Sequence, residues 1–250
     1  MQVMSKSPKQ ATDVRQASLV LAALRLAAQR SPADITTTDL ARAVGITQGA
    51  VFKHFASKDA IWLAAMDWVT QALMDQLDAA ATRAQHRAET GTYLPSQRPD
   101  HASADPLSVA PKPGALQGDA AWPMAALRAV FMAHVDFVVT HPGVPRLIFQ
   151  ELQRTDDTAL KARARQLMAS YRTLLMRLLI QAKEHRCIAP STDLTSAAVL
   201  FIGSIQGLVM QSLISGDVPA MVQQAEGVFA IYQRGLRNHT PVATPHFLTV

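Results

Sequence analysis

The chain has very little cysteine and carries no motif of a common enzyme class. Cys187 is the single cysteine among 250 residues, which excludes a disulfide within the chain. No Walker loop or dinucleotide-binding fingerprint occurs, the eight histidines show no paired metal spacing, and no serine or cysteine stands in a nucleophile motif. We therefore expect a protein that is not an enzyme and that holds no metal or other cofactor.

The sequence shows no secretory signal, and its one long uncharged run does not have the features of a membrane span. No apolar run follows the early lysines, so no secretory signal is predicted, and the cytoplasm is the expected compartment. Residues 194–216 form a run of 23 uncharged residues, which is long enough to span a bilayer. Its Ser, Thr and Gln side chains would need polar partners in lipid, its flanks carry acids, and no second span is recognised. We predict a buried helix here and no membrane partner.

Alternating strand patterns are absent, and apolar residues recur at helical spacing beyond residue 57. We predict an all-α fold of about nine helices. After the N-terminal helices, the expected helical segments are 59–87, 122–140, 144–154, 158–186, 193–215 and 219–237. Residues 91–118 contain five prolines and three glycines, which predicts a linker or a long loop, with disorder favoured over a lid. The tail 238–250 is expected to fray.

Positive charge is concentrated near the amino end. Residues 1–60 hold eight lysines or arginines and four aspartates, a net charge of +4 out of the chain's +5. A polyanion would be drawn to this end of the molecule, although charge alone leaves both nucleic acid and an anionic membrane open.

Residues 35–58, ITTTDLARAVGITQGAVFKHFASK, predict two short helices joined by a tight turn. Thr36 stands at an N-cap position with Asp39 three residues later, Gly45 can end the first helix in the left-handed conformation, and Thr47 can cap the second. The apolar positions are Leu40, Ala43 and Val44, then Val51 and Phe55. Such a bihelical unit usually places its second helix in the major groove of DNA.

The second of these helices leaves a small, polar and basic face outward, formed by Gln48, Gly49, Ala50, Lys53 and His54. The two smallest of these residues leave room for close backbone approach. The face suits a groove that is lined by phosphates and base edges.

From about Ala17 to Met66 the sequence resembles the TetR family of transcriptional regulators. The resemblance rests on a long first helix (SLVLAALRLAAQR), a threonine-led second helix (TTTDLARAVGI), a recognition helix that opens TQG and closes in His-Phe, and Ser-Lys-Asp at the start of a fourth helix. Two departures occur. Phe52 replaces the family's usual Tyr, which keeps a ring for packing but loses a phosphate-binding hydroxyl, and residues 29–31 replace the Gly that usually ends the first helix.

The resemblance implies which residues contact DNA. Backbone contacts are expected from Thr37, Thr38, His54 and Lys58, and base contacts from Arg42, Gln48, Ala50 and Lys53. We include Thr47, the expected cap of the recognition helix, in the DNA-binding set. For each side chain the alternative is a solvated surface residue, and this alternative weighs most for Arg42 and Lys53.

The resemblance also implies that helices beyond residue 120 surround a small-molecule cavity. Two apolar stripes at helical spacing carry polar side chains, namely His134 in the first and Tyr171 in the second. The expected lining residues are Phe131, His134, Met168, Tyr171 and Gln206. A buried histidine with a structural partner and ordinary core packing are the alternatives.

A dimer interface is implied for the last two helices. Gly203 and Gly207 lie four residues apart and would permit close helix approach, and Val228, Phe229 and Tyr232 would supply apolar area. A monomeric core helix is the alternative.

Together these features predict a helix-turn-helix domain at residues 1–60, with a flexible arm at 1–12, and a ligand-binding and dimerisation domain at 61–237. The expected function is a repressor that binds a palindromic DNA operator as a homodimer and is released by a hydrophobic small-molecule effector. The alternative is a DNA-binding or helical scaffold that is controlled by a protein partner and has no small-molecule pocket.

Overall fold

The computed structural model describes residues 8–90 and 122–237, with side chains from residue 12 onward. Within these ranges the regular structure is helical, with nine α-helices, one 3-10 helix and no strand, so the all-α prediction is confirmed. The helices are α1 (Pro8–Ala27), η1 (Pro32–Asp34), α2 (Thr37–Ala43), α3 (Gln48–Val51), α4 (Lys58–Thr90), α5 (Trp122–Thr140), α6 (Gly143–Leu152), α7 (Ala159–Glu184), α8 (Leu194–Ser215) and α9 (Ala220–Arg237). The predicted loop at 91–118 and the tail from 238 lie outside the described residues.

The helices from α5 to α9 lie within two residues of their predicted bounds, and both ends of α8 show the local chemistry that sets such bounds. Asp193 caps α8 by accepting from the backbone N–H groups of Thr195 and Ser196 at 3.2 and 3.0 Å. Gly216 ends the same helix in the left-handed conformation, at φ +74°. Signals of this kind involve neighbours in the chain, so a sequence displays them directly.

The N-terminal boundaries differ from the prediction. Helix α1 begins at Pro8, so residues 8–12 of the predicted arm are helical. Helix α4 runs without a break from Lys58 over 33 residues, about 50 Å at 1.5 Å per residue, so the predicted domain boundary at residue 60 falls inside a helix. Its buried face repeats every four residues, at Ile61, Ala65, Val69, Leu73 and Leu77.

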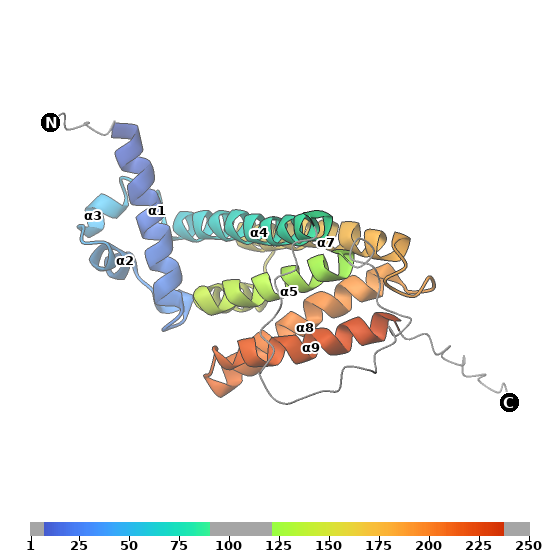
Figure 1. Ribbon diagram of the computed structural model, residues 1–250. Helices are drawn as coiled ribbons and strands as arrows, with labels where there is room; N and C mark the ends of the chain where they lie inside the picture. The colour runs from blue at the N-terminus through green and yellow to red at the C-terminus, as the bar shows by residue number, and fades with distance from the viewer. Residues whose placement is uncertain (1–7, 91–121, 238–250) are drawn as a thin grey trace, which may run out of the picture.

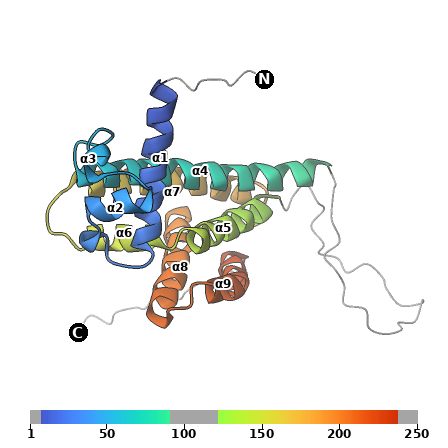
Figure 2. The same cartoon turned by 90° about the vertical axis from the view of Figure 1, so that its left-hand side faces the viewer.

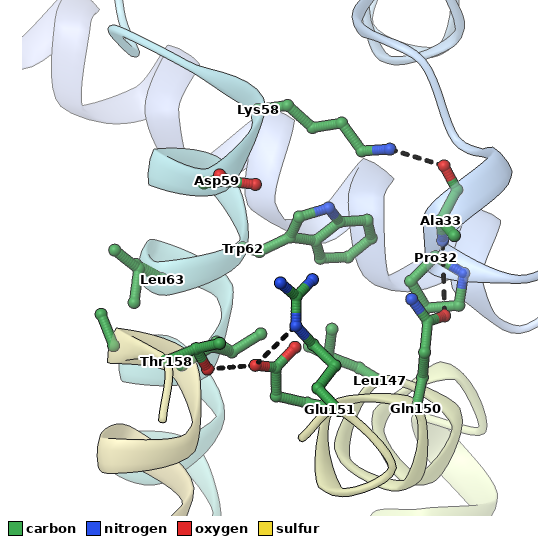
Figure 3. Close-up of a pocket in the computed structure, with 13 residues that line it drawn as sticks. Pro32, Ala33, Lys58, Asp59, Trp62, Leu63, Leu147, Gln150, Glu151 and Thr158 are labelled. Atoms are coloured by element: carbon green, nitrogen blue, oxygen red, sulfur yellow. Dashed lines mark hydrogen bonds and ion pairs between the residues drawn. The ribbon is translucent and has the colours of Figure 1, made fainter. Parts of the chain in front are cut away.

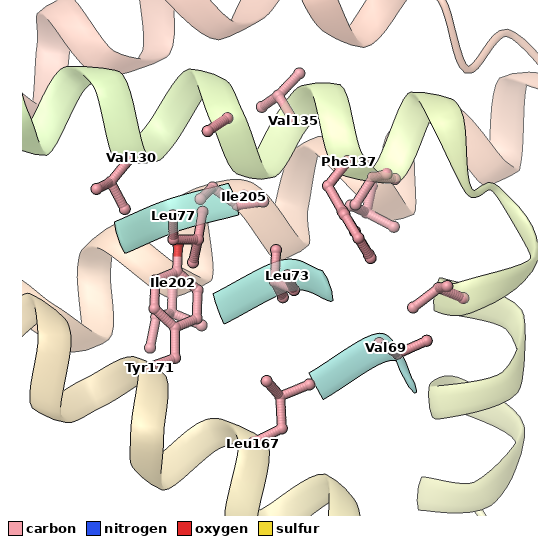
Figure 4. Packing of buried hydrophobic residues seen from close by; sticks show 14 of the residues in the cluster. Val69, Leu73, Leu77, Val130, Val135, Phe137, Leu167, Tyr171, Ile202 and Ile205 are labelled. Carbon is pink, nitrogen blue, oxygen red and sulfur yellow. The ribbon is translucent and has the colours of Figure 1, made fainter. Parts of the chain in front are cut away.

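Helices α1 to α3 gather at the N-terminal end of α4, and the remaining helices extend from there (Figure 1). Helices α5 and α7 pack along α4, and the α8–α9 hairpin packs against α5 on its other side (Figures 1 and 2). Leu77, Tyr171, Ile202 and Ile205 bring α4, α7 and α8 into one core (Figure 4).

Two helices are long and apolar enough to cross a membrane by length and composition alone, α5 and α8. Only the second of them stands out in the sequence as an uncharged run of this length. In each helix about half of the apolar window, 56% and 44%, is buried against the rest of the chain. A core helix of a helical bundle passes the same test, so this finding carries little weight.

Candidate DNA-binding face and ligand cavity

Helix α2 is fixed at both ends by hydrogen bonds. The Thr36 hydroxyl accepts from the Asp39 backbone N–H at 3.1 Å, and the Asp39 carboxylate accepts from the Thr36 backbone N–H at 2.9 Å, which completes a capping box. Hydrogen bonds from Thr36, followed by one from Arg30, hold the pKa of Asp39 well below its usual range. The carboxylate is therefore charged at neutral pH and lies at the positive end of the helix dipole.

The turn between α2 and α3 has the geometry that the sequence predicts. Gly45 adopts a φ of +69°, and the Ile46 N–H donates to the Ala41 carbonyl at 3.0 Å across the turn. Thr47 then caps α3 by accepting from the Ala50 N–H at 3.3 Å. The apolar stripe of α2 differs from the sequence prediction at one position. Ala43 is exposed, and Ala41, which directly follows the buried Leu40, is buried instead.

Five of the nine predicted DNA-binding residues are exposed on this unit, and the other four are half-buried. The exposed residues are Thr38, Arg42, Thr47, Gln48 and Lys53, and the half-buried ones are Thr37, Ala50, His54 and Lys58. The Gln48 side-chain amide donates to the Thr37 hydroxyl at 3.0 Å, so the first residues of α2 and α3 are linked side by side.

Two of the half-buried residues, Lys58 and His54, form hydrogen bonds within the chain. The Lys58 ammonium donates to the Ala33 carbonyl at 2.7 Å (Figure 3). The Nδ1 atom of His54 is buried and has no hydrogen-bond partner among the described residues, while the His54 carbonyl accepts from Gln16 at 2.9 Å. The Lys58 ammonium would have to leave the Ala33 carbonyl to reach a phosphate.

Phe52 was expected to keep its ring for packing, and the structure places half of it in solvent, with an exposed fraction of 50%. It directly follows α3 and forms the C-cap of that helix. A large apolar side chain on a face otherwise formed by polar and basic residues can contact a thymine methyl group or the sugar edge. The sequence showed the missing hydroxyl but gave no sign of the exposure.

An apolar cavity of about 350 Å³ lies among α4, α5, α6, α7 and α8. Three predicted ligand residues line it, His134, Met168 and Gln206. The other two do not: Tyr171 and Phe131 are fully buried in the core, where Phe131 packs against Phe201 and Phe229. The volume falls within the range of small-molecule sites, which favours a ligand-responsive protein over a scaffold with a collapsed core.

His134 has both a structural partner and a place in the cavity wall. Its Nδ1 atom lies 3.0 Å from the Tyr171 hydroxyl. Burial lowers the pKa of His134 to about 4 and raises the pKa of Tyr171 well above its usual value. Both groups are therefore neutral at physiological pH, and this end of the cavity carries no charge.

A second, more polar cleft of about 250 Å³ lies where α4, α6 and α7 meet η1 (Figure 3). Glu151 is buried in its wall, accepts a hydrogen bond from Thr158 and lies 3.9 Å from Arg154. These contacts join the end of α6 to the start of α7.

Helix α6 touches both the cavity and the N-terminal helices. Val144, Ile148 and Phe149 line the cavity. On the other side of the helix, Gln150 accepts from the Ser31 hydroxyl at 3.0 Å, and Gly143 packs so closely on α1 that an added Cβ would lie 2.0 Å from the Leu24 carbonyl oxygen. Only glycine fits at that position.

The predicted dimer residues divide into two groups. Phe229 and Tyr232 are buried inside the chain, and the Tyr232 hydroxyl donates to the Ala197 carbonyl at 3.1 Å, so neither can face a second copy. Gly203 and Gly207 are exposed, a Cβ added at either would have nothing within 4 Å beyond the helix's own backbone, and Val228 is half-buried. Around them lie exposed apolar side chains that the sequence analysis did not single out: Val199, Leu200, Met210, Ile214, Val222 and Ile231.

A short helix-turn-helix unit, joined by a long helix to a helical bundle with an apolar cavity, defines the class of one-chain transcriptional regulators that read DNA and sense small molecules. Residues 19–65 match the family described as bacterial regulatory proteins, tetR family, and residues 123–228 match the tetracyclin repressor-like C-terminal domain. The chain belongs to the TetR family of transcriptional regulators. Members of this family bind DNA operators as dimers and respond to small-molecule effectors.

Solved structures share the fold at low sequence identity. The fatty acid degradation regulator FadR from Bacillus halodurans aligns with a TM-score of 0.64 at 15% identity, over 94% of this chain and all of that chain. FadR from Bacillus subtilis, in complex with stearoyl-CoA, gives 0.62 at 13% identity, over 88% and 99%. The ketosteroid regulator KstR2 of Mycobacterium tuberculosis gives 0.58 at 17% identity, over 95% and 98%. Likeness at these identities establishes the fold alone.

Proposed function

We propose that this regulator is a cytoplasmic repressor that binds a palindromic operator as a homodimer and leaves it when a hydrophobic small molecule occupies the cavity. The dimer would present its two α3 helices about 34 to 36 Å apart, one turn of B-form DNA. Each would enter the major groove of one half-site.

The DNA-binding role is supported by the chemistry of the exposed face. Gln48 can pair with adenine, and Arg42 or Lys53 can pair with guanine or a phosphate oxygen. Arg42 has 78% of its side chain in solvent and lies 3.9 Å from Asp39, so it is free to turn toward DNA. The positive charge of residues 1–60 would add sequence-independent attraction.

Release from DNA by a ligand is supported by the position of α6, which lines the cavity on one side and contacts the N-terminal helices on the other. A ligand that pushes on Val144 or Ile148 from within the cavity displaces the same helix that contacts α1 through Gly143 and the start of η1 through Gln150. Because α1 packs on α2, this displacement would change the spacing of the two recognition helices. The ligand must bind the released conformation more tightly than the DNA-bound one, since equal affinity would shift nothing.

The dimer is supported by the outer face of α8 and α9. Leu200, Gly203, Gly207 and Ile214 lie on one side of α8, and Ile231 extends this apolar face onto α9. Glu226, which pairs with Arg128 of α5, marks the opposite flank of α9. We call the exposed apolar side of these two helices the α8–α9 face.

The experiment begins with selection of bound fragments from random duplexes by the full-length protein. Operator affinity is then measured by fluorescence anisotropy against salt. If the dimer neutralises about eight phosphates, log affinity should fall with log salt at a slope near −7, and a slope near zero would contradict the contact set. Compounds that stabilise the protein in a thermal-shift screen are next tested for operator release. If none of them changes operator affinity, the induction step is wrong.

Gln48→Ala is expected to change which operators are preferred while retaining general DNA affinity. Loss of a bidentate base contact should cost about 1–3 kcal/mol at one base position, roughly 5- to 150-fold in discrimination. Competition between the selected operator and duplexes altered at single positions measures this loss. Gln85→Ala, an exposed glutamine far along α4, is the matched control. Equal base preference in Gln48→Ala and wild type would remove Gln48 from the reading face.

Lys58→Ala has the opposite expected signature. If the Lys58 ammonium leaves Ala33 to hold a phosphate, its removal should weaken binding to all sequences alike and reduce the salt slope by about one. The same anisotropy titrations measure both quantities. An unchanged salt slope would show that Lys58 stays on Ala33 in the complex.

A further inference from the structure

The charges around the cavity all have one sign. Twenty residues line it, and the two that are charged at neutral pH are both arginines of α7, Arg165 and Arg172. No aspartate or glutamate lines it. The arginines are seven residues apart, two helical turns, so they project from the same side of α7.

Both arginines lie at the mouth of the cavity. Arg165, Ala169 and Arg172 are exposed on the outer side of α7. Ala164 and Leu167, on the inner side of the same helix, are buried. The Arg165 guanidinium already pairs with Asp157 at 2.6 Å. Arg172 forms no ion pair with any residue that the structure describes, so its charge is available to a ligand.

The interior offers no group that would hold a charge. Leu73, Phe137, Ile202 and Ile205 form an apolar wall, and His134 is neutral at physiological pH. A charged head group placed there would lose its hydration with no opposite charge to offset the loss, which favours the mouth of the cavity as its place.

We propose that the cavity binds an anionic amphiphile, whose single apolar chain lies between α5 and α8 and whose acidic head group lies against the Arg172 guanidinium. This inference rests on the proposed function, because it names the chemical class of the effector for the same cavity. A carboxylate can accept two parallel hydrogen bonds from a guanidinium, which is stronger and more directional than pairing with a lysine. Arg165 lies two helical turns away on the same side of α7, where its pairing with Asp157 leaves Arg172 as the arginine available to the head group.

Direct binding to the full-length protein without DNA tests the inference. Isothermal titration calorimetry below the micellar range compares dodecanoate, dodecanol and dodecyltrimethylammonium, which share a chain and differ in head-group charge. Dodecanoate should bind about ten- to a hundredfold more tightly than dodecanol, and the cation should bind most weakly. Dodecanol binding as tightly as dodecanoate, or tighter binding of the cation, would overturn the inference.

The variant Arg172→Gln assigns the head group. It should lose about tenfold in affinity for dodecanoate and nothing for dodecanol. Arg177→Gln is the matched control, since Arg177 lies on the same helix, pairs with Asp78 at 3.0 Å and does not line the cavity. If Arg172→Gln keeps the full preference for dodecanoate, the head group lies elsewhere and the inference is wrong.

A chain-length series places the apolar part. From octanoate to dodecanoate, affinity should rise about fourfold for each added methylene, the equivalent of about 0.8 kcal/mol, until the cavity is filled. Independence of chain length would mean surface binding and would contradict the inference. The affinities of dodecanoyl-CoA and dodecanoate are then compared. Tighter binding of dodecanoyl-CoA would identify a CoA thioester as the source of the anionic head, and tighter binding of dodecanoate would identify a free acid; both are anionic amphiphiles.

These measurements separate two failures. In the first, the protein shows no preference for anions but still binds its operator and is released by another stabilising compound. This result would refute the ligand class and leave the proposed function standing. Anionic preference without any effect on operator affinity would refute the induction step and leave the ligand class standing.

Discussion

Replacing Leu200 by Glu is expected to convert the dimer into a monomer and to lower affinity for a two-half-site operator by about a hundredfold or more. Leu200 is 55% exposed on the α8–α9 face, with Met210 and Ile214 further along the same helix. A carboxylate placed there would be buried against apolar surface without a partner whenever two copies met. A monomer retains one recognition helix and loses the effective concentration, in the millimolar range, that linking two half-sites provides.

Light scattering after size exclusion gives the mass, and anisotropy with full and half operators gives the affinities. Half-site affinity should stay near the wild-type monomeric value, which shows that the DNA-binding unit is intact. Ile231→Glu, on α9, should have the same effect from the neighbouring helix. Ile180→Glu is the control, because Ile180 is 44% exposed on α7 and lies outside the α8–α9 face. If both face variants remain dimers with full operator affinity, the interface lies elsewhere.

The helix-turn-helix unit could be predicted from the sequence in detail because the interactions that shape it are local. Thr36 and Asp39 are three residues apart, Gly45 needs only its own φ, and Thr47 caps the next turn. Each signal is complete within a few residues of chain. The same reason explains why both ends of α8 were correct to within two residues.

The side of each helix that faces the core could be predicted less well. Periodicity shows that a stripe is apolar, but a stripe against the same chain and one against a second copy look alike. Phe229 and Tyr232 were therefore assigned to the dimer although they lie in the core, while Leu200 and Ile231 lie on the outside of the chain and were not singled out. Helix α8 is apolar on nearly all sides, so its sequence could not separate its core side from its outer side.

Long-range contacts were invisible for a different reason. The need for glycine at position 143 comes from its close contact with α1, more than a hundred residues earlier in the chain, and no local pattern shows it. Likewise, the contact of Lys58 with the Ala33 carbonyl depends on how α4 meets η1, which no local pattern specifies.

Because position 143 requires glycine, we expect the second large effect from the variant Gly143→Ala. The new methyl group would lie 2.0 Å from the Leu24 carbonyl oxygen and 2.9 Å from the Ala28 nitrogen. Both are backbone atoms, so α6 and α1 must move apart. We expect a loss of about 1–3 kcal/mol, as for overpacked cores, and a drop in Tm of about 3 to 10 °C. The larger effect should be on coupling, because α6 would no longer hold α1 in place.

Coupling is measured as the ratio of operator Kd with and without the most stabilising compound of the thermal-shift screen. Ratios of about 5- to 150-fold are usual, and in Gly143→Ala the ratio should fall toward one. Gly235→Ala is the matched control, since nothing lies within 4 Å of its added Cβ and alanine should stabilise the helix by about 0.5–1 kcal/mol. Gln150→Ala removes the contacts with Ser31 and Ala33 without a steric clash, and it should reduce coupling even if Gly143→Ala folds poorly. Wild-type coupling in both variants would mean that α6 does not carry the response, and that the cavity acts on the DNA-binding unit through α4 instead.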